Sequence, residues 1–277
     1  MSALADHHRG GDGPPLLLVH GFTATWRAWG PVRELLEQQF DVLAPTLPGH
    51  TDGPPLDDVA DVVPAMTARL EAMLDEVGWP QPHVAGFSLG GHLALELAKR
   101  GRARSVTALA PAGAYGDHLG KELKRSGRQF RRNHGAAVRL ARMAARLASS
   151  PVVRRLALRD MMVDGSRPSG EESAAMIAAF AATPVFGAYL DDAALAGREL
   201  RDLDQVQVPT TILWGDRDRV LPQAKHEAFF REALPAARFE TLKRAGHVPF
   251  WDAPERVADV IAQTALTAER QREPAAR

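Results

Sequence analysis

The chain of 277 residues contains no cysteine, and this absence removes several classes of protein at once. Without a thiol, a disulfide-stabilised scaffold, a thiolate metal site and a cysteine nucleophile are all excluded. Positive net charge is also lacking: 34 lysines and arginines balance 34 aspartates and glutamates, which gives no support for nucleic-acid binding. Near the N-terminus the longest apolar run covers only residues 16–19, far too short to span a membrane.

The N-terminal residues 1–13 are polar and carry His7 and His8. They contain no apolar region typical of a signal peptide, so we expect a cytoplasmic protein with no stable membrane insertion. The two histidines have no third candidate ligand beside them, which favours a mobile polar end over a metal site. We expect neither a metal nor a cofactor.

What the chain does have is an alternation of short apolar runs with longer helical patterns. Alternation of this kind predicts a mostly parallel, doubly wound α/β sheet with helices on both faces. The polar tail at 269–277 is expected to fray. Strands are predicted at residues 16–20, 40–44, 83–87, 105–110, 210–213 and 238–242, and helices at 31–39, 57–77, 89–100, 223–234 and 254–268.

A segment rich in alanine and arginine interrupts this alternation. It contains no comparable strand and is expected to form several helices, broken near 149–151, 167–170 and 183–184. Because it lies between the fourth and fifth predicted strands, it is expected to form a lid over one end of the sheet. The predicted organisation is therefore a core domain of residues 1–114 and 205–277 with a helical lid of residues 115–204.

A Gly-x-Ser-x-Gly motif, Gly86 to Gly90 with Ser88 at its centre, lies between a predicted strand and a predicted helix. A serine on so sharp a turn needs small neighbours, and Gly86 and Gly90 supply them. The turn would raise the Ser88 hydroxyl above the ends of the parallel strands. The N-terminus of the following helix would add partial positive charge there. The alternative is a simple strand–helix turn.

With this motif the chain resembles the α/β-hydrolase family of serine hydrolases, and three further segments match that family in order. They are His20-Gly21-Phe22, the run from Gly215 to Pro222, and Gly246-His247. The resemblance implies an α/β-hydrolase fold with a helical lid. It also implies an oxyanion hole made by the backbone N–H groups of Phe22 and Leu89. His20 is expected to support that loop.

The resemblance also assigns the rest of a catalytic triad. His247 maps onto the base, and Asp218 maps onto the acid, with Asp216 as the competing residue and Asp117 as the next candidate. A serine hydroxyl is a poor nucleophile at neutral pH, so the histidine must remove its proton and later return one to the leaving group. The acid would hold the imidazole in the required tautomer.

The expected function is cleavage of a carboxylic ester, with a small-molecule ester or acyl compound as substrate. Epoxide hydrolases and haloalkane dehalogenases of this fold use an aspartate as nucleophile, so Ser88 favours esters, thioesters, amides or activated C–C bonds. A thioesterase, a C–C bond hydrolase, a cofactor-free perhydrolase and a non-catalytic small-molecule receptor remain alternatives. The family's opening hairpin must be short or partly missing here. His50, in a partly matching loop, is expected to be structural.

The predicted lid is strongly basic, with twelve lysines and arginines and one acid, Glu122, between residues 121 and 159. Two interpretations remain: a solvated face of amphipathic helices, or a positive lip that attracts an anionic acyl group, a carrier or a membrane surface. The later lid is apolar, and most of its large side chains are expected to pack on the main domain while a few line an acyl pocket. These residues are Met161, Met162, Val163, Met176, Ile177, Phe180, Val185 and Phe186.

Overall fold

The computed structural model describes residues 6–56, 61–114, 116–191 and 199–272, with the backbone alone given for residues 116–126, 144 and 145. The strands are β1 (His7–Gly10), β2 (Pro15–Val19), β3 (Asp41–Pro45), β4 (His83–Phe87), β5 (Ser105–Leu109), β6 (Thr210–Gly215) and β7 (Arg238–Leu242). The main-domain helices are α1 (Gly30–Leu36), α2 (Val62–Glu76), α3 (Leu89–Lys99), α10 (Gln223–Ala233), α11 (Pro249–Asp252) and α12 (Pro254–Arg272).

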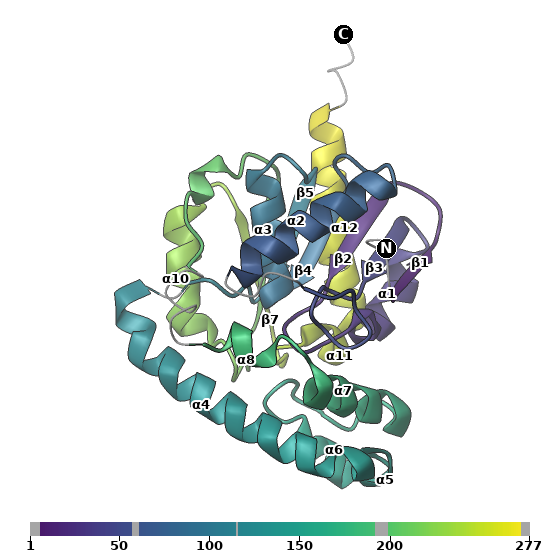
Figure 1. The fold of residues 1–277 in the computed structure, drawn as a ribbon. Helices are drawn as coiled ribbons and strands as arrows, with labels where there is room; N and C mark the ends of the chain where they lie inside the picture. Colours follow the sequence, from purple (N-terminus) through teal and green to yellow (C-terminus); the bar gives the residue numbers. More distant parts are fainter. Residues whose placement is uncertain (1–5, 57–60, 115, 192–198, 273–277) are drawn as a thin grey trace.

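One sheet of seven strands organises the fold, in the order β1-β3-β2-β4-β5-β6-β7. Every pairing is parallel except that of β1 with β3 (Figure 1). The predicted doubly wound, mostly parallel sheet is therefore confirmed. Because parallel strands point the same way, the loops that follow β4, β6 and β7 all leave the sheet at one edge.

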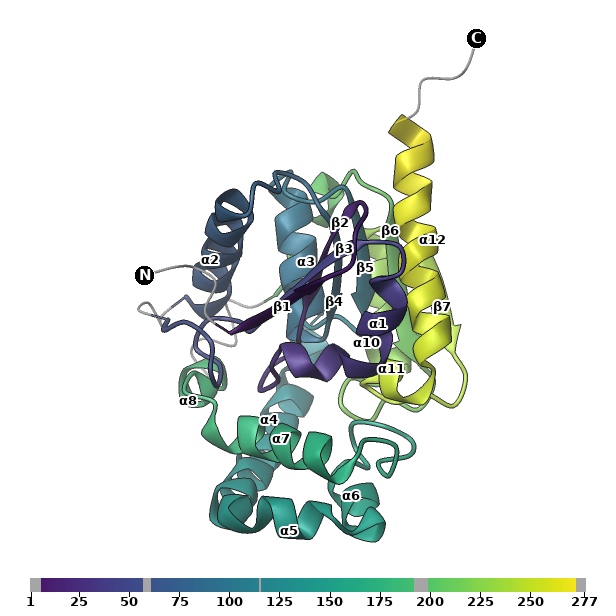
Figure 2. The ribbon, with the colours of Figure 1, turned by 90° about the vertical axis from the view of Figure 1, so that its right-hand side faces the viewer.

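Helices cover both faces of the sheet (Figures 1 and 2). In β2, Leu17 and Val19 enter the core beneath α2, α3 and α10, whereas Leu16 and Leu18 enter the core beneath α1, α11 and α12. Side chains alternate across a strand, so a strand buried on both faces is apolar at most positions. That preference explains why β2 and most of β4 appear in the sequence as apolar runs.

The N-terminal end differs from the expectation of a mobile polar segment, which was wrong for residues 7–10. These residues form β1, the antiparallel edge strand on β3. Arg9 donates two hydrogen bonds to Asp41, at 3.0 and 2.6 Å, and the His8 ring lies 2.6 Å from a Glu37 oxygen. Polar side chains fit an edge strand because one of its sides faces solvent, which is why no apolar run marks it.

The C-terminal end also differs from expectation. Helix α12 continues to Arg272, so residues 269–272 are helical rather than frayed. Glu269 lies 2.9 Å from Arg104 and 3.1 Å from the buried His83 ring. These partners come from the loop before β5 and from β4, and the sequence gives no sign of either contact. Residues 273–277 lie outside the described part.

The helical insertion between β5 and β6 is confirmed. It contains α4 (Gly116–Leu140), α5 (Ala144–Ala148), α6 (Pro151–Ala157), α7 (Gly170–Ala182) and α8 (Phe186–Tyr189). The helices are interrupted at the three predicted places, but α6 already ends at Ala157, and the break between α4 and α5 was not predicted. Short 3₁₀ turns lie at Trp26–Trp29, Ala141–Met143 and Leu203–Gln205. The insertion extends from the edge of the sheet that carries the loops after β4, β6 and β7 (Figures 1 and 2). Its division from the core at residues 114 and 205 remains a prediction.

Most of the apolar residues singled out in the insertion do pack inward. Met162, Val185 and Phe186 are buried, and Phe180, Met161 and Met176 are partly buried against the two cores. Ile177 is half-buried. Val163 differs, with 46% of its surface exposed.

Candidate active site

Ser88 occupies the sharp turn between β4 and α3. Its backbone angles, φ 55° and ψ −118°, lie in a region that residues with a side chain rarely adopt. Three hydrogen bonds hold this conformation: Ser88 N–H donates to Leu109 at 2.8 Å, and its carbonyl accepts from His92 and Ala112 at 3.1 and 3.0 Å. The half-buried serine is thus fixed at the carboxyl end of a central strand.

The two glycines of the motif are required by backbone contact. A Cβ on Gly86 would lie 2.1 Å from the Gly90 carbonyl oxygen. A Cβ on Gly90 would lie 2.0 Å from the carbonyl oxygen of Val19, in the neighbouring strand. Neither neighbour is a movable side-chain end, so any side chain at these positions would force the turn, or β2, to shift.

Asp218 and His247 form a buried pair. The Oδ2 atom of Asp218 lies 2.8 Å from Nδ1 of His247, and their side chains are 0% and 2% exposed. The other oxygen, Oδ1, accepts backbone N–H groups of Val220 and Leu221, each at 2.8 Å. An ionised carboxylate only accepts hydrogen bonds, so Nδ1 of His247 carries the proton and Nε2 is left as the acceptor.

Asp216, the competing acid, lies elsewhere. The residue is exposed, and its Oδ1 accepts the backbone N–H of Arg244 at 2.7 Å. It therefore ties together the loops that follow β6 and β7 without reaching the His247 ring. The side chain of Asp117 lies outside the described residues.

The loops after β6 and β7 approach each other so closely that Gly215 is required between them. A Cβ there would lie 2.3 Å from the Ala245 carbonyl oxygen. The N–H of Arg217 donates to the same carbonyl at 2.9 Å. Trp214 donates its ring N–H to the Leu221 carbonyl, in the loop after β6, at 2.8 Å. These contacts fix the position of Asp218 relative to His247.

Asp252 is a site residue that the sequence analysis missed. Its carboxylate accepts the N–H of Gly246 at 2.8 Å and that of Val163 at 3.0 and 3.1 Å. In addition, Val248 N–H donates to the Met161 carbonyl at 2.8 Å. The loop bearing His247 is thereby joined to the insertion. A single aspartate at the end of a short helix forms no motif, so the pattern offered no signal for it.

The loop after β2 lies at the same edge of the sheet. His20 supports it from below: Nδ1 donates to the Gly21 carbonyl and Nε2 accepts the N–H of Leu47, both at 2.8 Å. Burial, with His50 beside it, lowers the pKa of His20 well below its usual range, so this ring is neutral. The expected supporting role of His20 agrees with these bonds.

Two backbone N–H groups were expected to form an oxyanion hole. Leu89 is the first residue of α3, and the N–H groups of a first helical turn have no partner within the helix. Phe22 lies in the turn closed by the hydrogen bond from Ala24 N–H to the Gly21 carbonyl, at 3.2 Å. Because β2 and β4 are parallel neighbours in the sheet, the turn after β2 and the turn after β4 lie next to each other.

Aromatic side chains of the insertion cover the Phe22 ring. The rings of Phe130, Phe186 and Tyr189 have centroids 5.8, 5.6 and 4.1 Å from it. His134 stacks on Phe186 at 3.7 Å, and burial lowers the pKa of this histidine. These residues come from α4 and α8, so the insertion packs directly on the loop after β2.

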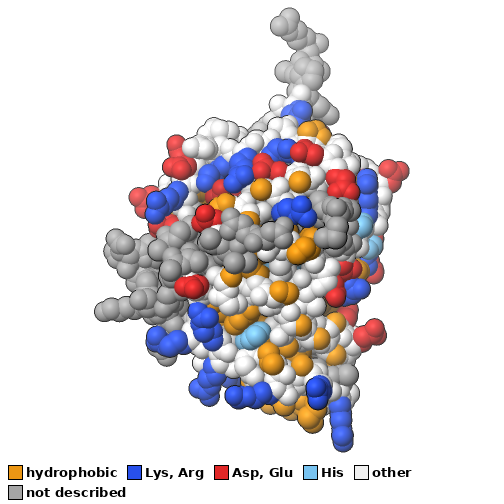
Figure 3. Space-filling model, in the orientation of Figure 1, with side chains coloured by type: hydrophobic (Ala, Val, Ile, Leu, Met, Phe, Trp, Pro, Cys, Tyr) orange, Lys and Arg blue, Asp and Glu red, His pale blue; other side chains and the backbone are white. Residues whose placement is uncertain are grey.

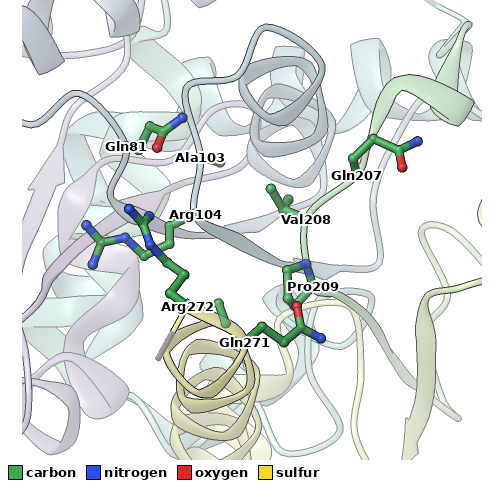
Figure 4. A pocket seen from close by; sticks show the side chains of 9 residues that line it. Gln81, Ala103, Arg104, Gln207, Val208, Pro209, Gln271 and Arg272 are labelled. Carbon is green, nitrogen blue, oxygen red and sulfur yellow. The ribbon is translucent and has the colours of Figure 1, made fainter. Parts of the chain in front are cut away.

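The other edge of the sheet holds a polar pocket of about 340 Å³, away from Ser88. Arg104 and Arg272 lie together at one side of it (Figure 4). Its residues lie where β4, β5 and β6 begin and where α12 ends. Within the described ranges, no three histidine, aspartate or glutamate side chains gather in a way that could hold a metal ion.

The parallel sheet, the serine turn after β4 and the Asp–His pair after β6 and β7 define an α/β hydrolase architecture. A family model described as "Alpha/beta hydrolase family" matches residues 16–260. The chain belongs to the alpha/beta hydrolase family.

None of the helices that the structure describes has the length and apolar character needed to cross a membrane.

Three relatives illustrate the range of this similarity. The chain is 35% identical to epoxide hydrolase EphH of Mycobacterium tuberculosis, over 70% of this chain and 90% of the relative. It is 25% identical to the pimeloyl-[acyl-carrier protein] methyl ester esterase of Aeromonas hydrophila, over 91% and 96%. A solved thermophilic esterase from Thermogutta terrifontis has a TM-score of 0.72 and 24% identity, over 95% and 93%.

Proposed function

We propose that this hydrolase cleaves a carboxylic ester through an acyl-enzyme, with Ser88 as the nucleophile. The observation that supports this most directly is the 2.8 Å contact between Asp218 and the buried His247, on the edge of the sheet that carries Ser88. The base has its proton on the nitrogen that faces the acid. The opposite nitrogen is the one that would accept the serine proton.

The proposed reaction has two halves. The Ser88 oxygen attacks the ester carbonyl while His247 takes its proton, and the negative charge that develops on the carbonyl oxygen is stabilised by the N–H groups of Phe22 and Leu89. His247 then gives its proton to the departing alcohol. In the second half the histidine activates a water molecule, which hydrolyses the acyl-enzyme and frees Ser88. Asp218 stabilises the imidazolium in both halves.

Epoxide hydrolysis is the second candidate, because the 35% identical relative bears that name. An aspartate that opens an epoxide forms an ester, which water can hydrolyse. A serine that opened an epoxide would form an ether, which a triad of this kind would not cleave. Ser88 therefore supports ester hydrolysis over epoxide hydrolysis for this chain.

Labelling with a fluorophosphonate tests the assignment of the nucleophile. We expect the wild type to be labelled at Ser88 and to hydrolyse p-nitrophenyl esters, whereas Ser88→Ala should lose both properties and keep its fold, measured by circular dichroism. Wild-type turnover of an epoxide without ester turnover would favour the second candidate. Full ester turnover by the purified Ser88→Ala variant would refute the proposal.

The class of bond that the enzyme cleaves can be determined with the same purified protein. A series of p-nitrophenyl esters of increasing acyl length, compared with thioesters and with vinylogous 1,5-diketones, separates an esterase from a thioesterase and a C–C bond hydrolase. A non-catalytic receptor would bind such compounds without turnover.

We further propose that the insertion acts as a lid that shapes the acyl pocket, since its aromatic rings pack on Phe22.

A further inference from the structure

The insertion concentrates the apolar side chains that are exposed to solvent. Seven large hydrophobic side chains are exposed among the described residues, and six of them lie between β5 and β6. The seventh, Leu266, lies on α12. The six are Val138, Leu140, Met143, Val152, Leu156 and Val163, each 46–64% exposed. A cluster of this kind usually marks a surface that contacts something else.

On α6 the apolar residues alternate with arginines. Val152 and Leu156, 64% and 61% exposed, are four residues apart and share one face of the helix. Arg155 and Arg159, also four apart, are exposed beside them. Arg154 is different, because it turns inward and donates to the Ala148 carbonyl at 2.8 Å. Arginine and hydrophobic side chains lie side by side at the lower end of the view in Figure 3.

Next to this face is a pocket of about 250 Å³. Arg155 and Arg159 line it from the insertion, together with Met162 and Val163. Three more arginines line it from the core, Arg217 and Arg219 after β6 and Arg244 after β7. Five cations thus surround one cavity, at the junction of the insertion with the loops that carry Asp218 and His247.

Nearby acids neutralise these arginines only in part. Arg155 lies 3.3 Å from Asp164, whereas Arg159 and Arg217 are 3.8 and 3.9 Å from Asp160 and Asp216. Arg219 donates to a backbone carbonyl, that of Arg159, at 3.2 Å. For the Arg244 side chain, the described part of the chain supplies no hydrogen-bond or ion-pair partner. Guanidinium groups in this arrangement fit the oxygens of a phosphate.

We propose that this arginine-apolar face, comprising Val152, Leu156, Val163 and the five arginines of the pocket, docks on an anionic phospholipid bilayer. The arginines bind headgroup phosphates, one of them within the pocket, while the three apolar side chains enter the interface. A soluble phosphate compound or a nucleic acid would account for the arginines but not for the exposed Val152 and Leu156. A bilayer satisfies both features.

The proposed docking fixes the orientation of the molecule. Helices α5 and α6 lie at the opposite end from the C-terminal part of α12 (Figure 2). The edge of the sheet that bears Ser88 would therefore face the lipid, and α12 would point away from it. Leu266, 49% exposed, and the exposed Arg270, both on α12, then offer matched control positions.

The test is sedimentation of the full chain with vesicles of phosphatidylcholine alone or of phosphatidylcholine with phosphatidylglycerol. We expect binding to the anionic vesicles that weakens with added salt, and little binding to the neutral ones. Arg155→Gln with Arg159→Gln should weaken binding on the order of tenfold or more, since each cation near such a surface contributes about 1 kcal/mol. Val152→Thr with Leu156→Gln should weaken it at the same net charge.

Leu266→Gln and Arg270→Gln should bind as the wild type does, and thermal unfolding should show that all variants are folded. The proposal is overturned if the wild type does not bind anionic vesicles, or if the apolar variant binds them as well as the wild type. It is also overturned if the α12 variants weaken binding equally. Binding of pyrophosphate or heparin by a protein that ignores the vesicles would assign the arginines to a soluble anion instead.

Discussion

At the scale of single residues, the loop after β6 carries two aspartates, Asp216 and Asp218, that lie only two positions apart but make different contacts. Asp218 is buried and accepts three hydrogen bonds, from the His247 ring and from two backbone N–H groups. Asp216 is exposed and receives a backbone N–H from the next loop. Both carboxylates stabilise the loops, but only one of them contacts the proposed base.

We predict that Asp218→Asn lowers kcat for ester hydrolysis by about 10⁴-fold. The asparagine oxygen would keep the N–H bonds of Val220 and Leu221, so its NH₂ group would face Nδ1 of His247. Nδ1 would then have to accept a hydrogen bond from this NH₂ group, so the ring proton would move to Nε2. With its proton on Nε2, the ring could no longer take the Ser88 proton. Steady-state kinetics with a p-nitrophenyl ester measures the change.

The matched control is Asp216→Asn, which keeps an oxygen for the Arg244 N–H and should change kcat less than about tenfold. Circular dichroism of both variants shows whether either has lost its fold. If Asp216→Asn is the inactive variant, the proposed acid is wrong by two positions. If both variants keep full activity, neither aspartate is the acid.

At the scale of elements, the turn from β4 to α3 is determined by how closely three backbone segments approach one another. Gly90 touches the backbone of β2, and Gly86 touches the first turn of α3. The strained angles of Ser88 persist because hydrogen bonds from β5 and α3 hold it on both sides. The sharp turn at Ser88 is therefore a property of the packed sheet and helix, not of the five-residue motif alone.

We predict that Gly90→Ala lowers the free energy of unfolding by about 3 kcal/mol or more. The new Cβ would lie 2.0 Å from the Val19 carbonyl oxygen and 2.6 Å from that of His20, and neither backbone atom can yield without moving β2. Activity should fall as well, because the same shift displaces the Phe22 loop. Urea denaturation at equilibrium measures the loss.

Gly135→Ala serves as the control for this substitution. Gly135 lies in α4, and outside the backbone of that helix no described atom lies within 4 Å of where its Cβ would stand. Alanine should therefore be neutral there or stabilise the helix by up to about 1 kcal/mol. A Gly90→Ala protein as stable as the wild type would show that β2 and the turn at Ser88 can move apart without loss of stability. Backbone contact would then not be the reason for a glycine at position 90.

At the scale of the whole molecule, buried neutral histidines connect the stability of the fold to pH. Burial lowers the pKa of His50 to about 4, and that of His83, held between Ser105 and Glu269, also to about 4. The unfolded chain binds these protons near the ordinary value of 6.5. The folded state resists protonation, so their contribution to stability is complete above pH 6.5 and is lost as the pH falls toward 4.

We predict that the wild type loses about 2 kcal/mol more stability than His50→Asn when the pH falls from about 7 to about 5. The asparagine NH₂ group can still donate to the Pro48 carbonyl, which the His50 ring contacts at 3.2 Å, but it does not titrate. Urea denaturation across this range measures both curves. Parallel curves for the two proteins would contradict the assignment of this pH dependence to His50.

Much of the fold follows from the sequence because its signals are local. A strand that is buried on both faces is mostly apolar, and this pattern predicts β2, β4, β5 and β6. The strand–turn–helix context of Ser88 likewise lies within a few consecutive residues. The sequence does not predict β1, because an edge strand needs no apolar run. It also does not predict the end of α12, because the residues that Glu269 contacts there, Arg104 and His83, are distant in the chain.

The sequence by itself determined the order of strands and helices, the place of the insertion and the residue types offered for catalysis, because periodicity and motif spacing are properties of neighbouring residues. Only the tertiary structure decided which aspartate meets His247, that Asp252 joins the loop bearing His247 to the insertion, and that five arginines from three segments surround one pocket. These depend on the distances between chain segments, and the packing of the sheet and its helices sets those distances.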